Sequence, residues 1–157
     1  RAEIVNLQIA DIDKSMKRIH IREGKGGKDR EVPLSPSLYQ ELCQHYRRLT
    51  RKPPVWLFPG GRYHTSDDPI SDKVVWHASR TAAERAGLRK RVHPHTLRHC
   101  FATHLYDAGT DIFVIQKLLG HHDVKETIRY VHLSNRHMKE LLNPLDQLPR
   151  FKRATED

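Results

Sequence analysis

The feature that most constrains the fold of this chain is the clustering of proline and glycine near its middle. Residues 51–69 contain four prolines and two glycines, a density that predicts a loop. Within this loop, Trp56-Leu57-Phe58 predicts a short extended piece that packs on the rest of the protein. The loop therefore separates a front part and a back part of the 157 residues, and their patterns differ.

The front part predicts a β-hairpin between two helices. The two strands of the hairpin are predicted at residues 18–22 and 30–34, where apolar and polar residues alternate. The glycine-rich segment 24–28 predicts the turn between them, with Lys25 at its tip. The helix before the hairpin is predicted at residues 1–7, with an apolar face made by Ile4, Leu7 and Val5. Ser35 or Ser37 caps the helix after it, which is anchored by Leu38, Leu42 and Leu49.

The back part predicts a series of helices, because capping residues recur at short intervals. The predicted helices lie at about residues 71–87, 94–109, 111–120, 124–131 and 134–142. Pro94 near the first turn and Gly109 just past the end show the asymmetry typical of a helix. An apolar stripe is expected to bury this helix, formed by Leu97, Phe101 and Leu105. The predicted fold class is α+β, mainly helical with a small antiparallel sheet.

The charge of the chain indicates a polyanionic partner. The formal net charge is +9 and the isoelectric point is about 9.8, so nucleic acid is the partner expected first. A membrane is disfavoured, since no apolar run approaches ~18 residues and no signal-like segment opens the chain. Cys43 and Cys100 form no C-x-x-C pair, which suggests neither a disulfide framework nor a cysteine zinc site. We therefore expect a cytoplasmic protein.

Four residues of the back part could together break a phosphodiester without a metal ion. They are His95, Arg98, His121 and Tyr130. A tyrosine hydroxyl can attack phosphorus, while imidazole and guanidinium groups neutralise the charge that builds on the phosphate oxygens. Each residue alone has an ordinary reading, as a solvated charge, a helix-end histidine or a core tyrosine. Only the four residues together, in this order on a basic chain, indicate cleavage of a phosphodiester.

Lys25 and His99 could also belong to this site. Lys25 on its glycine turn could be a plain hairpin residue, but it could also donate a proton to a leaving alkoxide. His99 lies four residues after His95, a spacing that could suggest metal binding. No H-E-x-x-H motif or suitably spaced carboxylate accompanies it, so packing or support of a catalytic neighbour is the preferred role.

Four segments carry a resemblance that covers essentially the whole chain. They are residues 24–34, 94–105, 118–121 and 127–132, and they contain His-x-x-Arg, Leu-Gly-His and Tyr-x-His signatures in a highly specific order. This set resembles the catalytic domain of the tyrosine recombinases, also called the phage integrase family. Residues 22–26 and 143–146 are similar to integron-type integrases in particular.

The resemblance implies a role for each candidate residue. Tyr130 would be the nucleophile that forms a 3′-phosphotyrosyl link with DNA. Arg98, His95 and His121 would hold the scissile phosphate, and His95 could accept the tyrosine proton. Lys25 would protonate the departing 5′ oxygen. Because the phosphotyrosine keeps the energy of the broken bond, rejoining would need neither ATP nor metal, so no cofactor is expected.

The first helix departs from the family pattern Gly-Leu-Arg-x-x-Glu, whose arginine is a further phosphate clamp. Glu3 matches the glutamate, which places that arginine one position before Arg1. We therefore expect Arg1 to be a neighbour of the clamp. We expect residues 1–157 to be the catalytic, carboxy-terminal domain of a longer recombinase, cut at its amino end and catalytically crippled as a fragment.

The function predicted from these observations is site-specific DNA cutting and rejoining by a recombinase or integrase. The partners predicted are double-stranded DNA and other protomers in a tetramer, with exchange of the apolar tail at residues 134–157. A catalytically inactive DNA-binding or regulatory module with the same fold is the rival. A metal-dependent nuclease that uses His121 and His122 is a third possibility, disfavoured because no acidic cluster accompanies them.

Overall fold

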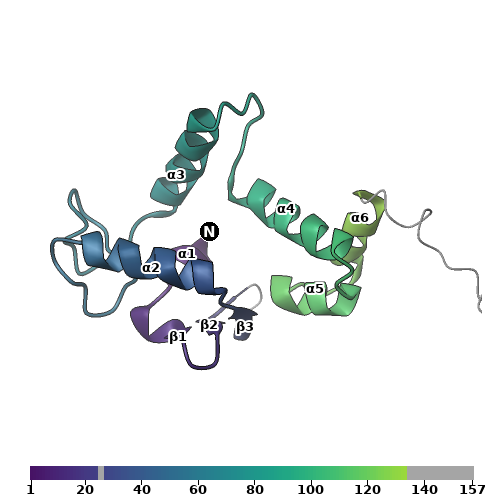
Figure 1. The fold of residues 1–157 in the computed structure, drawn as a ribbon, viewed down its shortest axis with the longest axis horizontal. Coiled ribbons are helices and arrows are strands. Elements are labelled where there is room, and N and C mark those ends of the chain that lie inside the picture. The colour runs from purple at the N-terminus through teal and green to yellow at the C-terminus, as the bar shows by residue number, and fades with distance from the viewer. Residues whose placement is uncertain (25–26, 134–157) are drawn as a thin grey trace, which may run out of the picture.

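The computed structural model describes residues 1–24 and 27–133 and confirms the predicted α+β fold, mainly helical with a small sheet (Figure 1). Its elements are α1 (Ala2–Val5), the short 3-10 helix η1 (Ile9–Asp11), β1 (Ile12–Asp13), β2 (Arg18–Ile21), β3 (Arg30–Pro33), α2 (Pro36–Arg48), α3 (Asp72–Arg85), α4 (Pro94–Asp107), α5 (Ile112–Leu119) and α6 (Lys125–Leu133). The helix and tail predicted at residues 134–157 lie outside the described residues.

The three strands form one antiparallel sheet in the order β1-β2-β3. β2 and β3 are the two strands of the predicted hairpin, with Ile19 opposite Val32. β1 was not predicted, because its two residues are too few to show an alternating pattern; Ile12 pairs with Ile19 on the other side of β2.

The sheet, α2, the segment just after α1 and the loop after α2 share one apolar core. Its buried residues are Leu7, Ile19, Leu34 and Leu57, and α2 packs on it. The backbone N–H of Leu57 donates to the carbonyl of Leu7 at 2.9 Å, which confirms the predicted packed piece of the loop. The prediction that Ile4 and Leu38 anchor their helices is wrong, because both side chains are exposed. The inward face of α2 passes through Tyr39 and Leu42, and helix α1 ends before Leu7.

Helices α4, α5 and α6 form a second core on the other side of the molecule (Figure 1). Its buried residues are Ala102, Ile115, Leu119 and Tyr130. The predicted burying stripe of α4 is wrong for Leu97 and Phe101, which are 54% and 47% exposed. The small side chain of Ala102, with Leu105 and Tyr106 three and four residues later, turns a different face of α4 inward.

Two helix ends fix the backbone beside the second core, as their residue types predicted. The Asp111 carboxylate accepts hydrogen bonds from the N–H groups of Phe113 and Val114 at the start of α5. Gly120 ends α5 in the left-handed conformation, with φ 68°, which glycine adopts without the strain of a side chain. The chain turns sharply there and presents His121. Helix α3 contacts both α1 and α4 and so links the two sides.

Candidate active site

A cleft of about 480 Å³ lies between the two sides of the molecule. Its lining comes from α1, the end of the hairpin, α4, the α5–α6 connection and α6, and includes Arg1, Ala2, Glu3, Glu23, Gly24, His95, Arg98, His99, His121, Glu126, Arg129 and Tyr130. The structure thus brings His95, Arg98, His121 and Tyr130 together. Lys25 lies outside the described residues, but its neighbour Gly24 lines the cleft.

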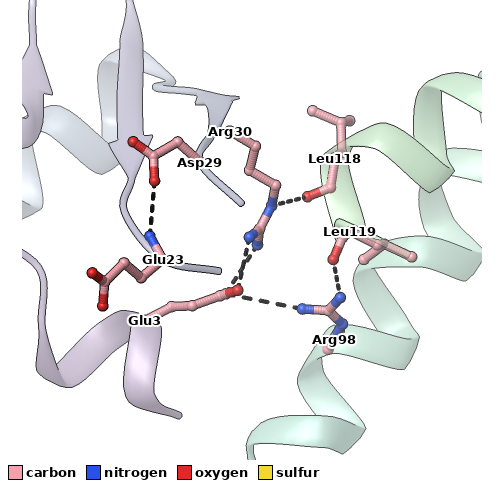
Figure 2. Close-up of polar contacts among 7 residues, drawn as sticks. All are labelled: Glu3, Glu23, Asp29, Arg30, Arg98, Leu118 and Leu119. Atoms are coloured by element: carbon pink, nitrogen blue, oxygen red, sulfur yellow. Dashed lines mark hydrogen bonds and ion pairs between the residues drawn. The ribbon is translucent and has the colours of Figure 1, made fainter. Parts of the chain in front are cut away.

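Arg98 points from α4 toward both the end of α5 and the first helix (Figure 2). Its Nη2 donates to the carbonyl of Leu119, and its Nη1 lies 4.0 Å from Oε2 of Glu3. Its side chain is only 28% exposed. The guanidinium is therefore held at the cleft by contacts that set its orientation, as a phosphate-binding group requires.

Glu3 and Arg30 form a two-pronged ion pair beside Arg98 (Figure 2). Arg30 Nη1 and Nη2 donate to the two carboxylate oxygens at 2.7 and 2.9 Å, and Arg30 Nε donates to the carbonyl of Leu118 at 2.9 Å. The hydrogen bonds from Arg30 hold the pKa of Glu3 below its usual value. The sequence carried a signal for this inward arginine, because Arg30 shares a face of β3 with the half-buried Val32.

His121 follows Gly120 and is oriented by α6. Its Nδ1 lies 2.9 Å from Oγ1 of Thr127, and Thr127 is fully buried. The backbone carbonyl of His121 accepts a hydrogen bond from the side chain of Gln116 at 3.2 Å. The α6 contact therefore fixes the imidazole at the edge of the cleft, and the α5 contact fixes the backbone that carries it.

Tyr130 lies beneath the cleft with a side chain that belongs to the second core. It is 1% exposed, and its ring stacks on that of His121 at a centroid distance of 6.4 Å. Its hydroxyl lies 3.0 Å from Nδ1 of His99, which agrees with a supporting role for that histidine. Burial raises the pKa of Tyr130, and the positive charge of Arg98 opposes the rise. The hydroxyl is therefore protonated at neutral pH and needs a proton acceptor to become a nucleophile.

His95 has an environment that favours its neutral form. Burial lowers its pKa first, and the positive charges of Arg1 and Arg98 lower it further. A neutral imidazole can accept a proton, which fits the base role that the resemblance implies. Arg1 itself lines the cleft, and the expectation that the clamp arginine precedes it stays a prediction.

Residues 1–24 and 27–133 contain no group of three or more His, Cys, Asp or Glu side chains that could hold a metal ion. Within the same residues, no helix has the length and apolar character needed to cross a membrane.

Comparison with known proteins decides the family. Residues 1–137 match the model of the phage integrase family. The chain belongs to this family. It is 39% identical over 139 residues to the tyrosine recombinase XerA of Pyrococcus furiosus, which covers 88% of this chain and 47% of that protein.

Solved structures of recombinases also match the fold. A crystal structure of XerA recombinase aligns with a TM-score of 0.74 and 34% identity, over 85% of this chain and 48% of that one. The XerH site-specific recombinase, bound to difH substrate in a pre-cleavage complex, aligns with a TM-score of 0.72 and 27% identity, over 89% and 41%. The chain spans about half the length of the curated relatives it matches. The similarity to integron-type integrases stays a prediction.

Proposed function

We propose that this chain is the catalytic part of a site-specific recombinase that cuts and rejoins DNA through a 3′-phosphotyrosine intermediate. The observation that carries this proposal is the single cleft on which Arg98, His95, His121 and Tyr130 converge. The names of similar proteins support it, since XerA is a tyrosine recombinase and the site-specific recombinase XerH was solved bound to its difH substrate. The net charge of +9 suits a polyanionic partner.

In the proposed reaction, the oxygen of Tyr130 attacks the scissile phosphorus while the bond from phosphorus to the 5′ oxygen breaks. Arg98 and His121 donate hydrogen bonds to the non-bridging oxygens, where charge builds in the transition state. The tyrosine proton passes to a neutral histidine, for which His95 is the candidate, and the 5′ oxygen takes a proton from Lys25. In the reverse step, a 5′ hydroxyl from another strand attacks the phosphotyrosine, so rejoining needs no new energy source.

The buried position of Tyr130 implies that this reaction begins with a movement. The hydroxyl is hydrogen-bonded to His99 and its ring is covered by the second core. An attack on DNA therefore requires Tyr130 to leave part of this packing, and DNA binding would supply the free energy for that change.

The proposed partners are double-stranded DNA and further copies of the recombinase. We propose a tetramer on DNA in which the tail after Leu133 is exchanged between protomers, with the cytoplasm as the place of action. The rival proposal is a DNA-binding module without chemistry. The two differ in one observable, because only the recombinase forms a covalent bond with DNA.

The test is covalent capture by the full-length recombinase on a nicked suicide substrate, from which the cleaved 5′ segment diffuses away. Tyr130→Phe should abolish capture and leave DNA binding nearly unchanged, because only the attacking oxygen is lost. Tyr106→Phe is the matched control, since Tyr106 packs against the same core and should keep its capture. Capture that survives in Tyr130→Phe, or that maps to Tyr106, would overturn the assignment.

A further inference from the structure

Arg30 connects the two sides of the cleft more directly than any residue assigned a role above. It lies on β3, pairs with Glu3 of α1 through two hydrogen bonds, and donates a third to the carbonyl of Leu118 on α5 (Figure 2). Its side chain is only 11% exposed. An arginine whose Nε and both Nη atoms are engaged and which is shielded from water is held firmly in place.

Two guanidinium groups share the single carboxylate of Glu3. Arg30 contacts both of its oxygens at 2.7 and 2.9 Å, whereas the nearest approach of Arg98 is 4.0 Å. The carboxylate of Glu3 is thus paired mainly with Arg30. Without Arg30, the closest remaining cation to Glu3 among these groups would be Arg98, and the two would attract each other in a partly shielded site.

Arg30 also packs against the turn that presents His121. A Cβ atom added to Gly120 would come within 3.3 Å of both Cδ and Nη1 of Arg30. The guanidinium therefore lies against the backbone of the turn and is also bonded to the carbonyl of Leu118. The next carbonyl, that of Leu119, accepts a hydrogen bond from Arg98.

We propose that Arg30 is a positioning residue for the strand-transfer reaction. By binding Glu3, it keeps the charge of Arg98 directed to the DNA phosphate, and by binding the Leu118 carbonyl it holds the turn before His121. This inference rests on the proposed function for its link to catalysis. The sharing of Glu3 between Arg30 and Arg98 can be measured without catalysis.

The first experiment compares capture by Arg30→Ala, Glu3→Gln and the double variant at saturating DNA. Arg30→Ala should slow capture about tenfold or more, and adding Glu3→Gln should restore several-fold of that loss, because the neutral amide no longer attracts Arg98. A purely structural role for Arg30 predicts a double variant as slow as Arg30→Ala or slower, and this result would overturn the proposal. Arg18→Ala is the matched control, since Arg18 forms an exposed ion pair with Glu31 on the same hairpin.

The second experiment follows the Arg98 guanidinium by nitrogen-15 NMR in the same proteins without DNA. In Arg30→Ala, rotation about the bonds from Cζ to the two Nη atoms of Arg98 should slow, because Arg98 now pairs with Glu3. Glu3→Gln in the same protein should reverse this change. An Arg98 signal that Arg30→Ala leaves unchanged would overturn the proposal, whatever the capture rates. Altered NMR signals in a protein that never captures DNA would instead count against the proposed function alone.

Discussion

The two sides of the cleft are built on cores of different kinds. The core shared by the sheet and α2 consists of aliphatic residues, Leu7, Ile19, Leu34 and Leu57. The core of α4, α5 and α6 includes Tyr130, the proposed nucleophile, among its buried residues. The first side can therefore stay packed throughout the reaction, while the second must give up part of its packing. We call these the sheet side and the helical side.

The polar groups of the two sides also differ, because those of the sheet side pair with each other and those of the helical side face the substrate in the proposed reaction. The sheet side presents the pair of Glu3 and Arg30, whose charges satisfy each other. The helical side presents His95, Arg98 and His121, which line the cleft and act on the DNA phosphate in the proposed reaction. The comparison indicates a division of labour among the described groups, in which the pair of Glu3 and Arg30 supports the site and the groups of the helical side act on the phosphate in the proposed reaction.

The sharpest test of this division adds a group to the sheet side. Placing Gly-Leu-Arg directly before Arg1 completes the family pattern ahead of Glu3 and should raise covalent capture on the order of 100- to 1000-fold, because the added arginine donates to the transition-state oxygens. Gly-Leu-Ala in the same place is the matched control. Equal capture with both extensions would mean that Arg1 already fills the clamp role and that the register of the first helix is wrong.

One core substitution on each side tests whether packing on that side affects the rate of capture. Ile19→Ala on the sheet side and Ile115→Ala on the helical side each remove a buried side chain and should each cost about 2–5 kcal/mol in the free energy of unfolding. At a temperature where both variants are folded, only Ile115→Ala should change the rate of capture, since its cavity adjoins the core of Tyr130. Capture and the midpoint of urea unfolding check the two expectations. Similar effects on capture would remove the distinction between the sides.

The same two sides show what the sequence could predict. Helix ends were found because capping is local: Asp111 and Gly120 act within their own turn. The inward face of α4 was missed, because an alanine that allows close packing of three helices leaves no apolar signal of its own. Ala102 is fully buried whereas Phe101 is 47% exposed.

The candidate site follows the same rule. Its members were found from ordered motifs, but the contacts between them join residues far apart in sequence. The bonds from Arg30 to Glu3 and Leu118, and from His99 to Tyr130, depend on how the two sides meet. No spacing along the chain encodes these distances, so tertiary packing had to supply them.

A smaller effect is expected in the pH dependence of capture. The pKa of His95 is lowered by burial and by the positive charges near it, so the histidine loses its proton at a lower pH than the usual value of about 6.5. If His95 accepts the tyrosine proton, capture should fall as the pH drops through this lowered pKa, so the midpoint of the acid limb should lie below 6.5. His95→Gln should remove this acid limb. A limb at or above pH 6.5 in the unaltered protein would contradict the assignment.

The smallest effect is expected from removal of divalent ions, which tests whether side chains on the helical side suffice to neutralise the phosphate. Arg98, His95 and His121 supply the donors in the proposed mechanism, and Lys25 supplies the proton for the leaving oxygen, so capture in excess chelator should equal capture in its absence. Arg98→Ala provides the comparison, because a metal-assisted enzyme should lose less from that change when metal is present. A strict requirement for a divalent ion would mean that these side chains do not suffice to neutralise the phosphate. It would assign the protein to a metal-dependent class of DNA-cleaving enzyme.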